Sequence, residues 1–286
     1  MSGAIKMPLS EVALRFPKLS DIVEFKTGGQ KCVYRALHST YGNVALKLIS
    51  PQTEFDRIAR EIELVDRLGI ANVPKIHETG YLDFVGNKIF FIIEQFVEGV
   101  SLREKYASEG AQRKMTKDES VCLLRTMLEV IVRLEQEHVI HRDIKPENIL
   151  VGDDGKYWLI DFGAARDLDG KTLTLTGKCA PLTPGYAAPE QFKAELMKQL
   201  DSRADLFALG VTVYELVSGA NPFLRPGYGM YDVLRSTIVE TADTLEIPGD
   251  ERGELAGFIK TLMQKNPTFR PPTAKWALTI LNGLGV

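Results

Sequence analysis

The sequence predicts an α+β fold in two lobes, a small β-rich lobe followed by a larger lobe made mostly of helices. Two observations lead to this prediction. Short β-type runs broken by glycine and asparagine dominate the first part of the chain, whereas capped, amphipathic or apolar segments of helical length dominate the remainder. We expect a leader over residues 1–20, the small lobe over residues 21–96 and the large lobe over residues 97–286.

The small lobe is expected to hold five strands and one helix. Its strands are short and are separated by turn residues such as Gly28-Gly29 and Tyr41-Gly42-Asn43. The first three should form an antiparallel meander, and a helix capped by Thr53 should follow, because apolar residues recur there at helical spacing. The expected strands cover residues 22–26, 32–37, 44–49, 75–81 and 88–96, and the expected helix covers residues 53–68.

The large lobe is expected to be mostly helical. Thr116 and Glu119 are spaced as a capping box, which marks the start of a long amphipathic helix. The run at residues 204–217 is almost wholly apolar, and its length favours a buried helix that ends at Gly219. Two further helices at residues 254–264 and 273–281, and a hairpin with strands at 149–151 and 157–160, complete the lobe.

The composition is that of a folded globular protein. The chain has 286 residues, of which 44% are hydrophobic and 26% are charged, and its formal net charge is −3. These values argue against a disordered chain or a coiled coil. Because there is no basic excess, we expect no nucleic acid among the partners.

No sequence feature predicts a secretory signal or a membrane anchor. The longest apolar run, Ile89–Ile93, is far shorter than the ~20 residues that a bilayer-spanning helix needs. The cysteines Cys32, Cys122 and Cys179 are few and far apart, which fits a reducing compartment better than a disulfide framework. We therefore expect a cytoplasmic protein without a membrane anchor.

Three short motifs carry the chemistry. The densest polar cluster is His141-Arg142-Asp143-Ile144-Lys145-Pro146-Glu147-Asn148, which follows an expected helix and precedes an expected strand. Asp161-Phe162-Gly163 comes one strand later, and Val44-Ala45-Leu46-Lys47 lies near the end of the third strand. In order, spacing and context, this set resembles the protein kinase family over about residues 20–282. The resemblance implies the bilobal kinase fold and phosphoryl transfer from ATP.

The resemblance assigns roles to the polar residues of the large lobe. Asp143 matches the catalytic base that orients the acceptor hydroxyl, and Lys145 would place positive charge on the transferring γ-phosphoryl group. Asp161 and Asn148 match the residues that hold two metal ions. Mg²⁺ prefers such oxygen ligands, and Mn²⁺ is the alternative ion.

In the small lobe, Lys47 matches the lysine that binds the α- and β-phosphates. Its ion-pair partner should come from the helix of that lobe. Glu61 is our choice, because it follows Ile58 by three residues and precedes Val65 by four, on the inward stripe of the helix. Glu63 is the fallback, and the alternative for Glu61 is a solvated surface charge.

The glycine-rich loop departs from the family pattern. Of three glycine positions the chain retains Gly28, with Gly29 beside it, whereas Lys26 and Lys31 stand at the other two. Backbone amides at Gly28-Gly29 can still approach the phosphates. We hypothesise that Lys31 attracts the triphosphate; the alternative is a lysine that faces solvent.

The resemblance also implies an adenine site with apolar walls and backbone hydrogen bonds. Val33 and Ala45 would form its roof and Leu150 its floor, with backbone groups of Gln95 and Val97 at the hinge. Glu94 would lie deep in this site, at a position that is usually apolar, where we expect it to pair with a nearby cation. A register shifted by one residue is the alternative for this segment.

Two patterns indicate the class of kinase. Lys145-Pro146-Glu147-Asn148 follows the catalytic aspartate as in Ser/Thr kinases. Thr183-Pro184-Gly185-Tyr186, with Ala188-Pro189-Glu190, resembles the substrate-docking end of an activation segment. The resemblance implies that Thr183 hydrogen-bonds the catalytic aspartate and lysine, that Glu190 pairs with Arg270, and that Asp205 bonds the backbone of the catalytic loop.

Three threonines on alternate residues, Thr172, Thr174 and Thr176, lie in the expected activation loop. Arg142 resembles the arginine that holds a phosphorylated activation loop, since a phosphothreonine can order such a loop through arginine pairs. We hypothesise autophosphorylation at one or more of these threonines, supported by self-association. The alternative is a plain solvated loop.

The sequence therefore predicts an ATP- and Mg²⁺-dependent Ser/Thr protein kinase of the bacterial branch that acts on protein substrates. A pseudokinase that serves as a binding or scaffold module is the first alternative, because of the altered glycine loop and Glu94. A small-molecule kinase is the second, against which the docking segment argues.

Overall fold

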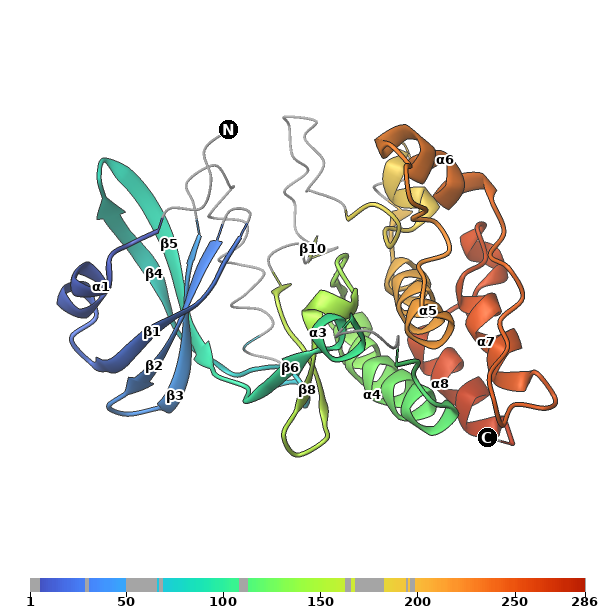
Figure 1. Cartoon of the computed structure of the whole chain (residues 1–286), viewed down its shortest axis with the longest axis horizontal. Coiled ribbons are helices and arrows are strands. Elements are labelled where there is room, and N and C mark those ends of the chain that lie inside the picture. The colour runs from blue at the N-terminus through green and yellow to red at the C-terminus, as the bar shows by residue number, and fades with distance from the viewer. Residues whose placement is uncertain are drawn as a thin grey trace. The chain divides into compact units, whose positions relative to one another are not determined.

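The computed structural model describes residues 6–28, 31–49, 66, 69–107, 113–162, 166–167, 183–193, 195 and 199–285. It divides into two compact units (Figure 1), here called the N-lobe (Met1–Gly69 and Pro74–Glu98) and the C-lobe (Ile70–Val73 and Gly99–Val286). The short stretch Ile70–Val73 joins the C-lobe because the Asn72 carbonyl accepts a hydrogen bond from the Leu159 amide at 2.9 Å.

The N-lobe contains one antiparallel sheet of five strands in the order β1-β2-β3-β5-β4. The five predicted strands are confirmed, each within a few residues of its expected bounds. They are β1 (Leu19–Gly28), β2 (Lys31–His38), β3 (Gly42–Ile49), β4 (Ile76–Phe84) and β5 (Asn87–Gln95). The predicted helix over residues 53–68 lies outside the described residues, apart from residue 66.

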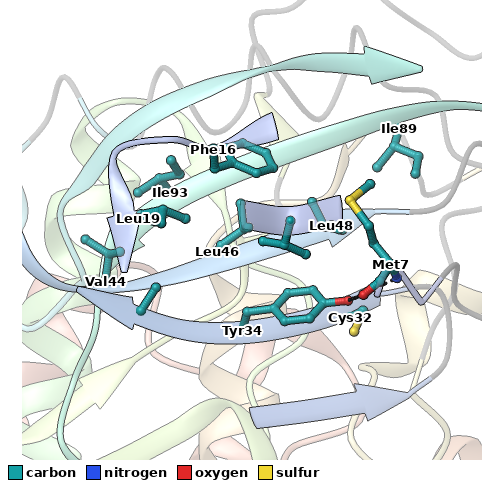
Figure 2. Packing of buried hydrophobic residues seen from close by; sticks show 12 residues of the cluster. Met7, Phe16, Leu19, Cys32, Tyr34, Val44, Leu46, Leu48, Ile89 and Ile93 are labelled. Atoms are coloured by element: carbon teal, nitrogen blue, oxygen red, sulfur yellow. Dashed lines mark hydrogen bonds between the residues drawn. The ribbon is translucent and has the colours of Figure 1, made fainter. Parts of the chain in front are cut away.

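One face of this sheet is the apolar core of the N-lobe. Tyr34 pairs in register with Leu46, and Leu46 with Ile93, so their side chains share this face. Helix α1 (Leu9–Arg15) and the residues beside it contribute to the same core, where Met7 and Phe16 are buried (Figure 2). The expected leader over residues 1–20 therefore contributes part of the N-lobe core.

A pair of hydrogen bonds fastens the start of this segment. The Met7 amide donates to the Tyr34 hydroxyl at 3.0 Å, and the same hydroxyl donates to the Met7 carbonyl at 2.6 Å (Figure 2). Because Tyr34 is fully buried, both of its hydrogen-bonding functions are satisfied inside the lobe.

The opposite face of the sheet is partly polar. Side chains alternate along a strand, so Val33, Ala45 and Lys47 point away from the core formed by Tyr34 and Leu46. Glu94 lies opposite Ala45 in the register of β3 and β5, and it shares their face. The residues predicted to contact the nucleotide in the N-lobe strands are thus on one surface.

The C-lobe is mostly helical. Its α-helices are α3 (Leu102–Ala107), α4 (Lys117–Gln136), α5 (Arg203–Ser218), α6 (Met230–Val239), α7 (Glu254–Leu262) and α8 (Ala274–Gly283). The predicted capping box is confirmed at α4, since Thr116 accepts from the Glu119 amide and Glu119 accepts from the Thr116 amide. The apolar segment is the buried helix α5, and Gly219 ends it in the left-handed conformation, with φ of 90°.

Small strands flank residues 141–148, which the sequence predicts to carry the catalytic base and which are here called the catalytic segment. Strands β6 (Gly99–Ser101), β8 (Ile149–Gly152) and β9 (Tyr157–Leu159) form one sheet, and β7 (Val139–Ile140) pairs with β10 (Arg166–Asp167). A 3₁₀ turn, η1 (Pro146–Asn148), leads into β8. Within the described part of the chain, we find no helix with the length and apolar character required to cross a bilayer.

Candidate active site

The segment between β7 and β8 brings Asp143, Lys145 and Thr183 into one hydrogen-bonded triangle. Lys145 Nζ lies 2.9 Å from Asp143 Oδ1 and donates to Thr183 Oγ1 at 2.7 Å. The Thr183 hydroxyl in turn donates to Asp143 Oδ1 at 2.6 Å. Residues 183–190, predicted to be the substrate-docking end of the activation segment, are here called the docking segment. The catalytic segment and the docking segment therefore meet at one carboxylate, that of Asp143, although Asp143 and Thr183 are forty residues apart.

Asn148 binds the same aspartate from the other side. Its amide nitrogen donates to the carbonyl and to Oδ2 of Asp143, both at 2.8 Å. The side-chain oxygen Oδ1 is then the acceptor that Asn148 can offer to a ligand. The side chains of Lys145, Thr183 and Asn148, together with the Asp143 carbonyl that Asn148 binds, thus fix the position of the Asp143 side chain. This side chain is the predicted base.

Asp161 is the next residue after Ile160, and the backbone of Ile160 is bonded to that of Asn148. The Ile160 amide donates to the Asn148 carbonyl at 2.9 Å, which aligns the end of the hairpin with the end of the catalytic segment. Asp161 has a φ of 70°, in the left-handed region that a non-glycine residue seldom occupies. One carboxylate and one carboxamide oxygen are hard donors that suit Mg²⁺, which keeps water and phosphate oxygens as its other ligands.

Asp205 organises the backbone of the catalytic segment. Its carboxylate accepts from the amides of His141 and Arg142, both at 2.8 Å, from its place in the first turn of α5. Complete burial raises the pKa of Asp205, although the two backbone hydrogen bonds oppose that rise. These bonds hold Arg142 in a left-handed conformation with φ of 69°. His141 is buried edge-on against the Phe162 ring, 4.7 Å between centroids, and burial lowers its pKa.

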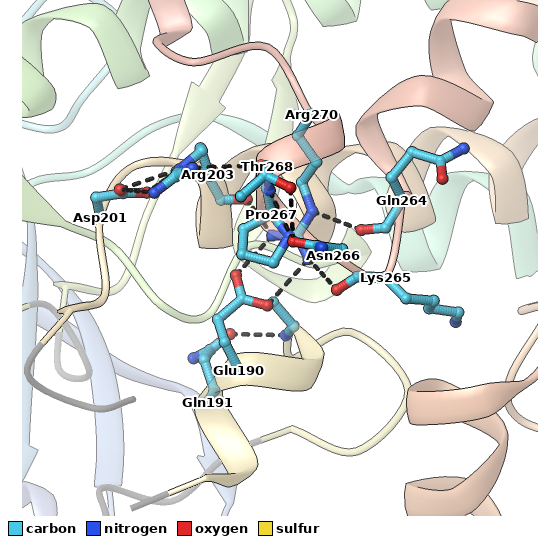
Figure 3. Close-up of polar contacts among 11 residues, drawn as sticks. Glu190, Gln191, Asp201, Arg203, Gln264, Lys265, Asn266, Pro267, Thr268 and Arg270 are labelled. Carbon is cyan, nitrogen blue, oxygen red and sulfur yellow. Dashed lines mark hydrogen bonds and ion pairs between the residues drawn. The ribbon is translucent and has the colours of Figure 1, made fainter. Parts of the chain in front are cut away.

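Glu190 and Arg270 form a buried, bidentate ion pair (Figure 3). The two bonds, Nη1–Oε1 and Nη2–Oε2, measure 2.6 and 2.9 Å. Arg270 also donates to the carbonyls of Gln264 and Arg203, at 2.7 and 2.8 Å. The pair therefore ties the end of the docking segment to α5 and to the segment between α7 and α8.

In the N-lobe, Lys47 of β3 pairs with Glu94 of β5. The Nζ–Oε1 distance is 2.6 Å, and the two side chains are only 10% and 12% exposed. The expectation that Glu94 pairs with a nearby cation is confirmed by this contact. Glu61, which was predicted to pair with the same lysine, lies outside the described residues.

The other predicted residues are distributed between the two lobes. Ala45 is buried beside this ion pair, Val33 is half-buried in β2, and the Gln95 amide donates to the Lys75 carbonyl at 2.7 Å. Val97 follows the end of β5, and Leu150 lies in β8. Gly28 ends β1, whereas Gly29, Thr172, Thr174 and Thr176 lie outside the described residues.

An aromatic group near the predicted hinge was missed by the sequence reasoning. Phe25 of β1 packs edge-on against Phe96, with 5.3 Å between ring centroids. The Arg35 guanidinium lies over the Phe96 ring at 4.9 Å and binds Glu98 at 2.5 Å. Phe96 directly follows β5, but no local pattern indicates that residues from β1 and β2 reach it.

Comparisons with known proteins agree with this geometry. The protein kinase domain model matches residues 24–279. A probable serine/threonine-protein kinase, PknB, of Corynebacterium glutamicum is 31% identical over 258 residues, which cover 87% of this chain and 39% of that protein. The serine/threonine-protein kinase PknL of Mycobacterium tuberculosis is 32% identical over 203 residues, covering 69% of this chain and 48% of PknL.

The chain thus spans less than half the length of these curated relatives. The same holds for PknD of Mycobacterium tuberculosis, which is 34% identical over 202 residues, or 29% of its length. The family model nevertheless covers nearly all of the chain, including both groups of site residues described above. The chain belongs to the protein kinase domain family, in its bacterial serine/threonine branch.

Proposed function

We propose that this domain transfers the γ-phosphoryl group of ATP to serine and threonine hydroxyls of protein substrates. The observation that carries the proposal is the set of hydrogen bonds around Asp143. Lys145, Thr183 and Asn148 all bind this carboxylate, at distances of 2.6 to 2.9 Å. A base held by three neighbours is positioned in advance for an acceptor hydroxyl, and positioning supplies much of the catalysis in phosphoryl transfer.

In this proposal the residues around Asp143 divide the work. Asp143 orients the acceptor hydroxyl and takes its proton. Lys145 places its ammonium group against the charge of the transferring phosphoryl group, and Thr183 holds both side chains in place. None of these residues forms a covalent bond to phosphorus.

Asp161 would hold one divalent metal ion and Asn148 a second, with Mg²⁺ preferred and Mn²⁺ as the alternative. A bound ion would neutralise charge on the phosphates. The described residues contain no cluster of three or more histidine, cysteine, aspartate or glutamate side chains arranged as metal ligands. Few protein ligands suffice for each Mg²⁺ ion when phosphates and water complete its coordination.

The N-lobe residues would bind the nucleotide. Lys47 would contact the α- and β-phosphates, with Glu94 and Glu61 as its carboxylate partners. The proposed contacts to adenine and to the phosphates come from Gly28, Gly29, Val33, Ala45, Gln95 and Val97 of the N-lobe. Leu150 of the C-lobe is the proposed floor of the adenine site. The shared sheet face of Val33, Ala45 and Lys47 supports this assignment.

Regulation by autophosphorylation is a separate part of the proposal. Thr172, Thr174 and Thr176 are the proposed acceptors, and self-association would bring one loop to the active site of a second copy. Mass spectrometry after incubation with ATP tests the sites, and a rate that rises with protein concentration tests the transfer between copies. We also propose a cytoplasmic location, in keeping with the sparse cysteines.

The decisive experiment compares the wild-type protein with Asp143→Asn, using Mg²⁺-ATP and casein as acceptor. Loss of a general base lowers the rate by about 10² to 10⁴-fold. Asp154→Asn is the matched control, since that aspartate lies in the exposed turn between β8 and β9. A wild-type protein that binds ATP but transfers no phosphate would favour the pseudokinase alternative. Transfer to small alcohols in place of protein would favour a small-molecule kinase.

A further inference from the structure

Arg103 lies at the centre of a polar cluster that the sequence motifs do not reveal. It is the second residue of α3, and its guanidinium group makes three short contacts. Nε donates to Glu147 at 2.7 Å, Nη1 to Glu215 at 2.6 Å, and Nη2 to the Tyr186 hydroxyl at 2.5 Å. Each of the three nitrogen atoms of the guanidinium group therefore donates to a different residue.

The partners come from segments that are far apart in the chain. Glu147 belongs to η1, between Lys145 and Asn148 of the catalytic segment. Tyr186 follows Thr183 by three residues in the docking segment, and Glu215 lies in the buried helix α5. One side chain thus joins the segment that carries the proposed base to the segment that carries Thr183.

A second layer of contacts holds the docking segment at the same place. The Tyr186 hydroxyl donates to Glu215 Oε2, so the phenol both gives and accepts a hydrogen bond. The Asn221 amide donates to the same Oε2 at 3.3 Å and to the Gly185 carbonyl at 3.4 Å. The Gly185 carbonyl and the Tyr186 hydroxyl are therefore both bonded to residues of α5 or of the chain just beyond it.

Gly185 allows this close arrangement. Its φ is +85°, and a Cβ atom added there would lie 2.6 Å from Leu224 Cγ. A side chain at this position would push the docking segment away from Leu224. The absence of a side chain at Gly185 therefore lets the docking segment pack against Leu224 while Tyr186 and Thr183 make their hydrogen bonds.

Charge makes Arg103 indispensable to the cluster. The Glu215 side chain is buried, and the other donors in this cluster, Tyr186 and Asn221, are neutral. Burial raises the pKa of Tyr186, so its hydroxyl keeps the proton that it donates to Glu215. Without the guanidinium group, a buried carboxylate would lose the cation that compensates its desolvation.

We propose that Arg103 is a positioning residue for the protein acceptor. It fixes the docking segment at Tyr186 relative to the catalytic segment at Glu147, and so keeps Thr183 against Asp143. The inference rests on the proposed function, because an acceptor site has meaning only for a protein kinase.

The proposal separates acceptor binding from the chemistry of the nucleotide. Asn148 makes two bonds to Asp143 and a backbone bond to the Lys145 carbonyl at 2.9 Å, and none of these involves Arg103. We therefore expect Asn148 to keep its place when Arg103 is replaced. The docking segment, in contrast, loses its link to the catalytic segment at Glu147.

The test compares Arg103→Met, Arg103→Lys and Tyr186→Phe with the wild-type protein. We expect kcat/KM for a protein acceptor to fall by about tenfold in Arg103→Met. The KM for ATP should stay within about twofold of wild type, because the three residues that Arg103 binds are not among those proposed to bind the nucleotide. Arg103→Lys should lower kcat/KM for the protein acceptor less than Arg103→Met does, but still to below the wild-type value. An ammonium group cannot reproduce the three fixed donor directions of the guanidinium group. Arg113→Met is the matched control, since Arg113 binds Glu119 on the exposed surface of the same lobe.

Two further measurements keep the test decisive. Tyr186→Phe removes only a hydroxyl group, so it reports on the cluster even if Arg103→Met fails to fold, and its effect should shrink in the Arg103→Lys background. Hydrogen exchange over residues 183–188 should accelerate in Arg103→Met, whether or not the wild-type protein transfers phosphate. An inactive wild-type protein would refute the proposed function, and unchanged exchange in the variant would refute this inference. A KM for ATP that rose as much as acceptor phosphorylation fell would refute it as well.

Discussion

Lys47 and Glu94 form a nearly buried ion pair between neighbouring strands, with 2.6 Å between Nζ and Oε1. The pair lies on the face of the N-lobe sheet opposite α1 and the apolar core. The lysine that family resemblance assigns to the phosphates is therefore bound to a carboxylate that the sheet itself holds in place.

Replacing Glu94 by leucine should destabilise the N-lobe by about 3 kcal/mol, because removal of one member of a buried pair leaves an uncompensated charge. The double variant Glu94→Leu, Lys47→Met should lose less than the sum of the two single variants. Urea unfolding measures both quantities. Glu98→Gln is the control, since Glu98 and its partner Arg35 are each 44% exposed and a surface pair contributes at most about 1 kcal/mol. Strictly additive losses would contradict the coupling.

Thr183→Ala should lower kcat for a protein acceptor by about tenfold or more, because Asp143 and Lys145 both lose a hydrogen-bonding neighbour. Thr183→Ser should retain most of the activity, since it keeps the hydroxyl group. Steady-state kinetics at saturating ATP measure the difference. If alanine and serine behaved alike, the hydroxyl of Thr183 would have no role in positioning the base.

Arg270→Met should reduce the free energy of unfolding of the C-lobe by about 3–5 kcal/mol, since it leaves Glu190 buried without its cation. Arg270→Lys should recover little, because a lysine cannot bind both carboxylate oxygens and two backbone carbonyls. Thermal unfolding of these variants should be compared with that of Arg252→Met, a change at a side chain that is 83% exposed. A similar stability for Arg270→Met and Arg252→Met would argue against the structural role of the buried pair.

Phe16→Ala should destabilise the N-lobe by about 3 kcal/mol, the usual cost of emptying a buried aromatic site. Phe16 packs edge-on against Phe91, with 5.0 Å between ring centroids. Leu14→Ala offers a control two residues away, since Leu14 is 74% exposed and its truncation should be nearly neutral. Chemical denaturation followed by far-UV circular dichroism measures the difference in stability, and equal effects of the two changes would contradict the placement of Phe16 in the core.

Much of this fold could be predicted because its signals are local. Short β-type runs separated by turn residues predicted the five N-lobe strands, and the Thr116–Glu119 spacing located the start of α4. The apolar run before Gly219 identified α5. The contacts of Thr183 and of Arg270 were anticipated only through the family resemblance, because neither residue has a local pattern that points to its partner.

The remaining features depend on distant contacts. Arg103 meets partners that are 44, 83 and 112 residues away in the sequence, so no periodicity connects them. Helix α1 is only seven residues long, and the burial of Met7 becomes visible only when Tyr34 is placed beneath it. Helix α6 exposes Met230 and Tyr231 at its start, which obscures the apolar stripe that would have indicated a helix.

The packing of Met7 and Phe16 has a practical consequence for anyone who expresses this domain. The family match begins at residue 24, yet the apolar cover of the sheet begins at residue 7. A recombinant fragment trimmed to the family boundary would leave Leu46 and Ile93 open to water. Such a fragment should aggregate and precipitate, whereas a fragment that retains Met7 and the upstream helix should purify as a monodisperse protein.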